Sequence, residues 1–157
     1  MRVMKIEAEV GEILRKRKMT VAVAESCTGG LISSRITDSS GSSDYFIMGV
    51  VAYSNKIKEN ILRIPGSLIR KYGAVSGQVA LEMAKGVRLI ARADIGIGVT
   101  GIAGPAGGTR SKPVGLVYIA LATGKKRLVK EFHFPGSRQE IKFQASQAAL
   151  DLLRKNI

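Results

Sequence analysis

Residues 24–30 (AESCTGG) place a hydroxyl, a thiol and a second hydroxyl in front of two glycines. They follow the apolar run 20–24, which predicts a short buried strand, and they open a predicted helix that continues over 31–36. A strand that enters a helix through small residues points backbone N–H groups and a hydroxyl at one spot. An anion or a reacting carbonyl could be held there. The plainer interpretation of these residues is a well-capped helix.

Ser26 is a candidate nucleophile, but an unactivated serine hydroxyl is weak and needs a base. His133, the single histidine, lies on a predicted strand among apolar residues. It is expected to be half-buried and structural, which argues against a Ser-His-Asp triad. A lysine whose pKa is lowered by desolvation could take the proton instead. Lys56 and Lys58 directly follow a predicted strand, and either could reach back to Ser26.

Cys27 competes with Ser26, because a thiol at a helix N-terminus ionises more easily than a free thiol. Burial as a small filler is the favoured interpretation, since free cysteine is among the most buried residue types. Thr28 is expected to make local hydrogen bonds. The glycine-rich run 101–108 offers amides that could cradle a phosphate or sugar. It matches neither the ATP nor the dinucleotide glycine pattern.

The elements that must position these groups alternate between helix and strand. Helices are expected at 4–17, 31–36, 56–62, 76–90 and 138–155, and strands at 20–24, 45–53, 94–100, 114–122 and 127–134. This order predicts an α/β fold, a three-layer α/β/α sandwich on a mixed, mostly parallel sheet. Ligands bind beyond the carboxyl ends of strands in such sheets, where residues 24–30, 53–58 and 100–108 would converge.

Composition limits the classes of protein to consider. The 157 residues are 45% hydrophobic, enough for one core, so a single domain over 1–157 is expected. No apolar run approaches the roughly 20 residues of a membrane span, and the charged start lacks the core of a signal peptide. A cytoplasmic protein without membrane association is therefore expected. One cysteine and one histidine exclude a disulfide and a Cys/His zinc site, and no metal is predicted.

The formal charge of +13 arises from 25 Lys and Arg against 12 Asp and Glu. Such an excess favours anionic partners, either a phosphorylated metabolite or nucleic acid, although surface solubility is the plainest explanation. The basic residues are scattered along the chain. Only 5% of residues are aromatic and none is Trp, which leaves few platforms for stacking bases. Nucleic acid is therefore the least favoured partner.

Six short blocks occur over nearly the whole chain: AESCTGG at 24–30, GSSDYF at 41–46, YSNKIK at 53–58, GAVS at 73–76, TGIAGPAGG at 100–108 and KPVG at 112–115. In this order and spacing they resemble the C-terminal domain family of the competence/damage-inducible CinA proteins, in its stand-alone form. The resemblance implies an amidohydrolase of pyridine-nucleotide salvage that converts nicotinamide mononucleotide to nicotinate mononucleotide and ammonia. It implies no metal or organic cofactor. Self-association is compatible with the sequence, which does not fix its order.

The resemblance also assigns roles to residues. Ser26 would be the nucleophile and Lys58 the general base, while Tyr53 would relay or position the proton. Backbone amides at the start of the Ser26 helix would stabilise the oxyanion before ammonia leaves and water cleaves the acyl-enzyme. The residues expected to bind substrate are Cys27, Thr28, Gly29, Thr100, Gly101, Gly104, Gly107, Arg138 and Lys142.

The chain departs from the family pattern at two positions. Lys142 stands where members commonly carry Arg, which binds phosphate through two hydrogen bonds where Lys acts as a point charge. Ser40 stands where the proline of a Pro-Gly-Ser-Ser turn is expected, which bears on the rigidity of that loop. Two other functions stay open. One is a non-catalytic nucleotide-binding module in which Ser26 is only a cap, and the less favoured one is a basic nucleic-acid-binding protein.

Overall fold

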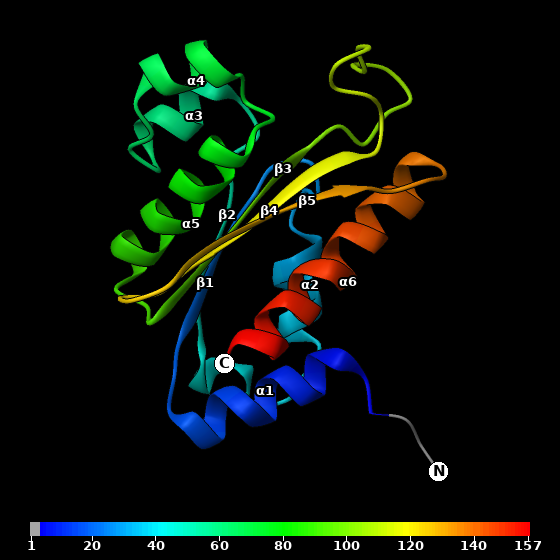
Figure 1. Cartoon of the computed structure of the whole chain (residues 1–157). Coiled ribbons are helices and arrows are strands. Elements are labelled where there is room, and N and C mark those ends of the chain that lie inside the picture. The colour runs from blue at the N-terminus through cyan, green and yellow to red at the C-terminus, as the bar shows by residue number, and fades with distance from the viewer. Residues whose placement is uncertain (1–3) are drawn as a thin grey trace.

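The structure is a computed structural model that describes residues 4–157. A five-stranded sheet carries helices on both faces (Figure 1), which confirms the three-layer α/β/α prediction. The strands are β1 (Val21–Glu25), β2 (Phe46–Val51), β3 (Ile95–Gly101), β4 (Leu116–Ala122) and β5 (Arg127–His133). The helices are α1 (Ile6–Arg17), α2 (Leu31–Thr37), α3 (Asn55–Asn60), α4 (Gly66–Tyr72), α5 (Gly77–Ala91) and α6 (Arg138–Asn156), with the 3-10 turn η1 (Ser42–Asp44) before β2.

The strands lie in the order β2-β1-β3-β4-β5. β1 pairs in parallel with both β2 and β3, whereas β4 is antiparallel to both of its neighbours. Four strands therefore run in one direction and β4 alone is reversed, so the sheet is mixed, with its pairings divided evenly between the two kinds. The carboxyl ends of β1, β2 and β3 meet at one edge, where the three sequence blocks were expected to converge.

The two faces of the sheet are packed differently. Toward α1, α2 and α6 the strands present large branched side chains: Val21, Val23, Ile95, Ile97, Val99, Val117, Ile119 and Leu121. Toward α5 they present small residues, among them Ala120 and Ala122. A Cβ added to Gly98 would stand 2.2 Å from the carbonyl oxygen of Ala80. The glycines of β3 therefore allow the backbone of α5 to lie directly against the sheet.

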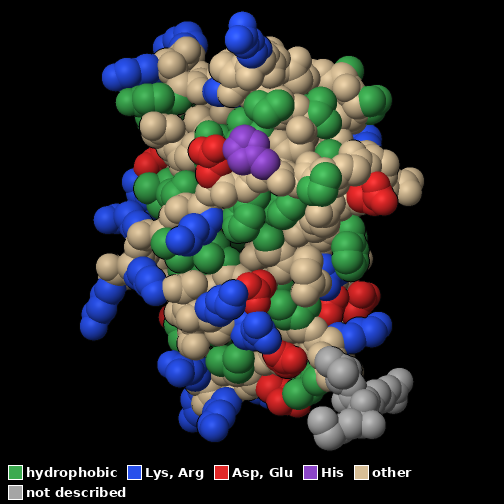
Figure 2. All heavy atoms as spheres, turned by 45° about the vertical axis from the view of Figure 1, so that its right-hand side comes forward, with side chains coloured by type: hydrophobic (Ala, Val, Ile, Leu, Met, Phe, Trp, Pro, Cys, Tyr) green, Lys and Arg blue, Asp and Glu red, His purple; other side chains and the backbone are tan. Residues whose placement is uncertain are grey.

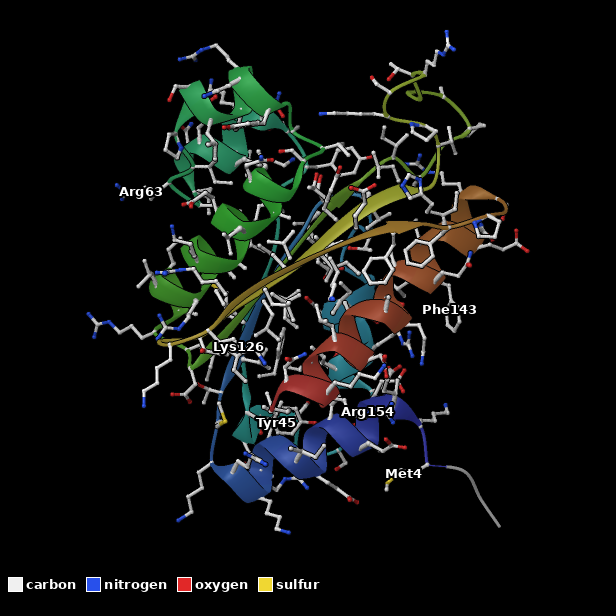
Figure 3. The ribbon with its side chains drawn as sticks, in the orientation of Figure 1. Met4, Tyr45, Arg63, Lys126, Phe143 and Arg154 are labelled. Carbon is white, nitrogen blue, oxygen red and sulfur yellow. The ribbon has the colours of Figure 1, made fainter. Side chains whose placement is uncertain are left out.

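Tyr45 anchors the turn that leads into β2. Its side chain is buried against α1 (Figure 3), and a Cβ added to Gly11 would stand 2.5 Å from the Tyr45 hydroxyl oxygen. Within residues 4–157, that hydroxyl is the one buried side-chain polar atom without a hydrogen-bond partner. The amide of Val21 donates to the carbonyl of Tyr45 at 2.8 Å, which ties the start of β1 to this turn.

Two local expectations about the helices need correction. The region between Pro65 and Ser76 contains α4, which was not predicted, because Pro65 was read only as the end of the preceding helix. Residues 26–30 form a turn, and α2 begins only at Leu31. The turn persists because Gly29 and Gly30 have φ angles of 61° and 99°, outside the right-handed helical region. In the described part of the chain no helix combines the length and apolar character needed to cross a membrane.

Candidate active site

A cavity of about 210 Å³ opens at the carboxyl edge of β1, β2 and β3. It is lined by Ser26, Cys27, Tyr53, Asn55, Lys58, Ala74, Val75, Thr100, Gly101, Ala103 and Arg138. The turn after β1, the start of α3, the segment before α5 and the end of β3 each contribute to its wall. Segments far apart in the sequence are therefore brought together here, as the predicted topology required.

Ser26 and Lys58 form the centre of this cavity. The Nζ atom of Lys58 lies 3.1 Å from the Oγ atom of Ser26, within hydrogen-bond distance. Lys58 is the one buried residue of α3, and it points back toward the end of β1. The choice between Lys56 and Lys58 is resolved by this geometry, because Lys56 is exposed on the same helix. No relay is needed between two groups in direct contact.

Burial shifts the Lys58 amine toward its neutral form. Its side chain is 1% exposed, and burial lowers the pKa of its ammonium group below the ordinary lysine value. No carboxylate in residues 4–157 pairs with it to oppose this shift. Nζ also donates to the carbonyl oxygens of Ala52 at 2.8 Å and Tyr53 at 3.1 Å. A neutral amine can give its two N–H groups to these carbonyls and turn its lone pair to the Ser26 hydroxyl.

Cys27 lies beside Ser26 but in a different chemical state. Its side chain is buried, and desolvation raises the pKa of the thiol to about 12. A thiol with that pKa is protonated at neutral pH, whereas the thiolate is the reactive form. The structure therefore agrees with the interpretation of Cys27 as a buried filler.

The backbone amides after Ser26 differ in whether they already have an acceptor. The first free amides of α2, those of Ile32 and Ser33, donate to the Glu25 carboxylate at 2.9 and 3.0 Å. They cannot also receive an anion. The amides of Cys27 and Thr28 precede the helix and donate to no acceptor within the described residues. The Gly30 amide likewise donates to no acceptor, and of these three residues only Cys27, which directly follows Ser26, lines the cavity. The turn after Ser26 therefore keeps amides that could donate to an oxyanion.

Tyr53 contributes to the site through two different groups. Its carbonyl oxygen accepts from Lys58, but its ring is 59% exposed and its hydroxyl accepts from Arg138 at 3.0 Å. The phenol therefore does not stand between Ser26 and Lys58, and a part for Tyr53 in relaying or positioning the proton stays a prediction. Arg138 also donates to the carbonyl of Gly104 at 2.5 Å, which joins the start of α6 to the glycine loop.

The remaining substrate-binding candidates separate into three groups. Thr100 and Gly101 line the cavity, and the Thr100 hydroxyl donates to the carbonyl of Ala74 at 2.8 Å. Lys142 and Gly29 lie outside the cavity but beside each other, with the Lys142 Nζ atom 3.4 Å from where a Gly29 Cβ would stand. The Thr28 side chain is fully buried and faces away from the cavity.

The glycine-rich loop 101–108 contributes fewer residues to the cavity than expected. Gly104 and Gly107 do not line the cavity. Gly104 has a φ angle of 77°, and a Cβ there would stand 2.4 Å from a methyl carbon of Val114. Packing inside the loop itself therefore requires a glycine at this position.

Four cavity residues were not singled out from the sequence: Asn55, Ala74, Val75 and Ala103. Each of them belongs to a sequence block that was singled out. Asn55 belongs to YSNKIK, Ala74 and Val75 belong to GAVS, and Ala103 belongs to TGIAGPAGG. Glu25 was missed as well, although it stands directly before Ser26. Its position at the end of an apolar strand was the available signal, because a fully buried carboxylate needs several partners.

His133 is correctly excluded from the site, but for a different reason than expected. It is exposed on the edge strand β5, where its Nε2 atom lies 2.8 Å from a carboxylate oxygen of Glu131. Figure 2 shows the histidine on the surface next to an acidic side chain. Across residues 4–157, no three His, Cys, Asp or Glu side chains gather as metal ligands would.

Comparison with known proteins finds one family for nearly the whole chain. The family model described as the CinA C-terminal domain matches residues 3–157. The chain is 52% identical over 152 residues to a CinA-like protein of Koribacter versatilis, covering 97% of this chain and 37% of that protein. It is 51% identical to a putative competence-damage inducible protein of Thermoanaerobacter pseudethanolicus, covering 96% and 36%. The chain thus spans little more than a third of the length of these curated relatives.

Two solved structures match nearly the whole of this chain, and the match covers nearly the whole of their own chains. The competence damage-inducible protein A of Klebsiella pneumoniae superposes with a TM-score of 0.93 at 32% identity, covering 96% of this chain and 94% of that one. A competence/damage inducible protein of Agrobacterium tumefaciens gives a TM-score of 0.89 at 36% identity, covering 98% and 96%.

Proposed function

Because the chain belongs to the CinA C-terminal domain family, we propose that its site hydrolyses the carboxamide of nicotinamide mononucleotide to nicotinate mononucleotide and ammonia. The observation that carries this proposal is the contact between the Ser26 hydroxyl and the buried amine of Lys58. A serine beside a desolvated lysine is an arrangement that activates a hydroxyl for attack on a carbonyl. The reaction would proceed without a metal or an organic cofactor.

In the first step the Ser26 Oγ atom attacks the carboxamide carbon while its proton passes to Lys58 Nζ. The carbonyl oxygen becomes an oxyanion, and the amides of Cys27 and Thr28 donate to it. When this intermediate collapses, the C–N bond breaks. The Lys58 ammonium returns its proton to the departing nitrogen, so that ammonia leaves and an acyl-enzyme on Ser26 remains.

Water completes the cycle in the second step. The neutral Lys58 amine takes a proton from water, and the hydroxide attacks the acyl carbon. Collapse of this second intermediate breaks the bond to Ser26 Oγ, which recovers its proton from Lys58. The carboxylic acid product ionises in solution, and the free enzyme is restored.

The size of the cavity supports an orientation for the substrate. At about 210 Å³ it is smaller than the roughly 300 Å³ at the lower end of pockets that enclose drug-sized ligands. The pyridine ring and its carboxamide would enter, and the ribose phosphate would remain at the mouth. Arg138, an exposed residue at the start of α6, lines the cavity, and Lys142 follows one turn later on the same helix.

Ammonia release from nicotinamide mononucleotide, with no metal added, tests the proposal directly. Wild-type protein should release ammonia and form nicotinate mononucleotide in equal amounts. Ser26→Ala should abolish turnover and keep the fold, while Cys27→Ala should retain substantial activity because it preserves the backbone amide. If the nucleotide raises the melting temperature of the wild-type protein without any ammonia release, the site is a binding module. An active Ser26→Ala beside an inactive Cys27→Ala would reverse the assignment of the nucleophile.

A further inference from the structure

The Glu25 carboxylate is fully buried and accepts four hydrogen bonds. Its Oε1 atom accepts from the Thr28 hydroxyl at 2.6 Å and from the Ile32 amide at 2.9 Å. Its Oε2 atom accepts from the amide and the hydroxyl of Ser33 at 3.0 and 2.8 Å. The side chain at the end of β1 is thereby joined both to the turn that carries Ser26 and to the first turn of α2.

We propose that Glu25 is a positioning residue for Ser26, acting through the hydroxyl of Thr28. The hydrogen bond from the Thr28 hydroxyl to the Glu25 carboxylate closes a ring of atoms that includes the backbone of Ser26. This ring holds the Ser26 hydroxyl at its distance from Lys58 and keeps the Cys27 and Thr28 amides turned to the reacting carbonyl. The inference rests on the proposed function, in which Ser26 is the nucleophile.

The local sequence explains why a carboxylate is needed at this place. Helices usually begin with a residue whose side chain accepts from the first amides, but the residue before α2 is Gly30, which has no side chain. Glu25 takes over that capping function from the preceding strand. A carboxylate at a helix N-terminus is also favoured by the helix dipole. One buried group thus caps the helix and fixes the turn in front of it.

Glu25 is not placed to act on the substrate. A carboxylate offers about four lone-pair directions, and four donors already occupy them. The side chain has no exposed surface and does not line the cavity. Its effect on the reaction must therefore pass through the backbone and side chain of the turn.

Two substitutions separate positioning from general stabilisation. Thr28→Val and Ser33→Ala each remove one hydroxyl donor to the same carboxylate, but only Thr28 belongs to the turn that carries Ser26. Thr28→Val should lower kcat by on the order of 100-fold with little change in KM, as misplacement of a reacting group by about 1 Å does. Ser33→Ala should stay within a few-fold of wild type, and Thr28→Ser should restore most of the rate.

A second readout does not depend on the amide substrate. Ser26 should react with a fluorophosphonate, and the mass of the labelled protein gives the rate of that reaction. Thr28→Val should be labelled much more slowly than Ser33→Ala, although thermal unfolding should show similar stability losses for both. Equal labelling rates for these two variants, or losses of rate that merely follow the melting temperature, would overturn the inference.

The labelling experiment also separates this inference from the proposed function. If wild-type Ser26 is labelled but no ammonia is released from nicotinamide mononucleotide, the proposed substrate is wrong, and the comparison of variants still tests Glu25. If wild-type Ser26 resists labelling and turnover is absent, the nucleophile and its positioning residue fall together. Glu25→Gln is the more direct variant, but its amide would place donors against the donors of Ser33 and endanger folding. The comparison of Thr28→Val with Ser33→Ala is therefore the deciding test of whether Glu25 positions Ser26.

Discussion

At Lys58 the proposed catalysis and the stability of the fold make opposite demands. Burial lowers the pKa of this group in the folded protein, so the unfolded chain binds its proton more tightly. The free energy of unfolding therefore rises with pH from the lowered pKa up to the ordinary lysine value of about 10.4. Below that window the folded protein bears the full cost of a buried ammonium group. A residue retained at such a cost is a candidate for function rather than for stability.

Replacement of Lys58 tests its role as the base. Lys58→Met keeps the apolar stem and removes the amine, so the rate of ammonia release should fall by roughly 100- to 10,000-fold, the usual contribution of acid–base catalysis. Lys56→Met is the matched control on the exposed face of α3 and should cost little. Steady-state kinetics of the two variants gives the comparison. Near-normal turnover by Lys58→Met would exclude the Ser-Lys mechanism and leave the fold assignment unchanged.

The pH profile gives a separate check on the same residue. Activity should rise with pH as Lys58 loses its proton, and the midpoint of this limb should lie below about 10.4 because burial lowers the pKa. The measurement is kcat/KM for nicotinamide mononucleotide across the alkaline range. In Lys58→Met the limb should vanish from the residual activity. A limb that persists unchanged in the variant belongs to another group.

Cys27 should be inert to alkylation in the native state. Its thiol is buried and its pKa is raised to about 12, so almost no thiolate forms at neutral pH. Intact mass after treatment with iodoacetamide should show no adduct, and an adduct should appear once the chain is unfolded in denaturant. Rapid modification of the folded protein would contradict the buried, protonated thiol.

The sequence predicted the pair Ser26 and Lys58 because the lack of a usable histidine left lysine as the base, and because the blocks resemble a known family. It did not predict the hydrogen bonds that the Glu25 carboxylate accepts from the Ser26 turn and from the start of α2. A carboxylate at residue 25 that accepts from residues 28, 32 and 33 is a contact of the folded turn. Local sequence patterns describe helix caps by the residue directly before the helix, and here that residue is a glycine.

At the scale of the elements, contact between α5 and β3 depends on glycine. Gly98→Ala would place a methyl group 2.2 Å from the Ala80 carbonyl oxygen, a backbone atom that can move only with its helix. The free energy of unfolding in denaturant should fall by about 1–3 kcal/mol or more, as expected for overpacking. Gly124→Ala is the control in the β4–β5 turn, where the nearest atom stands 3.4 Å away, and it should change stability by less than about 0.5 kcal/mol. Equal losses of stability in the two variants would show that α5 does not pack against β3 as closely as described.

The order of the elements was predictable from alternation, while one short helix was not. Strand-like runs and amphipathic runs follow one another along the chain, and the reversed β4 follows from its hairpin with β5. The helix α4 escaped detection because Pro65 and Gly66 open it, and both residues also mark loops. Proline is tolerated at the start of a helix, and Pro65 precedes α4 directly, whereas α3 already ends at Asn60.

For the whole molecule, the charge of +13 has a measurable consequence. Basic side chains are scattered over the face in Figure 2 rather than gathered in one patch. Such a distribution attracts anions over a long range, and salt screens the attraction. The value of kcat/KM for nicotinamide mononucleotide should fall as sodium chloride is raised, whereas that for the riboside, which lacks the phosphate, should change little. The same salt dependence for both substrates would assign the effect to something other than the phosphate. Nanomolar binding of duplex DNA without any effect of the nucleotide would instead favour a nucleic-acid-binding protein.

The saturated N-terminus of α2 also bears on how this fold can diversify. Since Glu25 occupies the helix amides, the phosphate of the proposed substrate has to be received by another element, and Arg138 and Lys142 on α6 are the basic candidates. In the proposed reaction, acyl transfer and recognition of the phosphate then reside on different segments of the chain. Substitutions in the first two turns of α6, in natural relatives or in a directed-evolution library, would then change which amides are accepted and leave Ser26 and Lys58 in place.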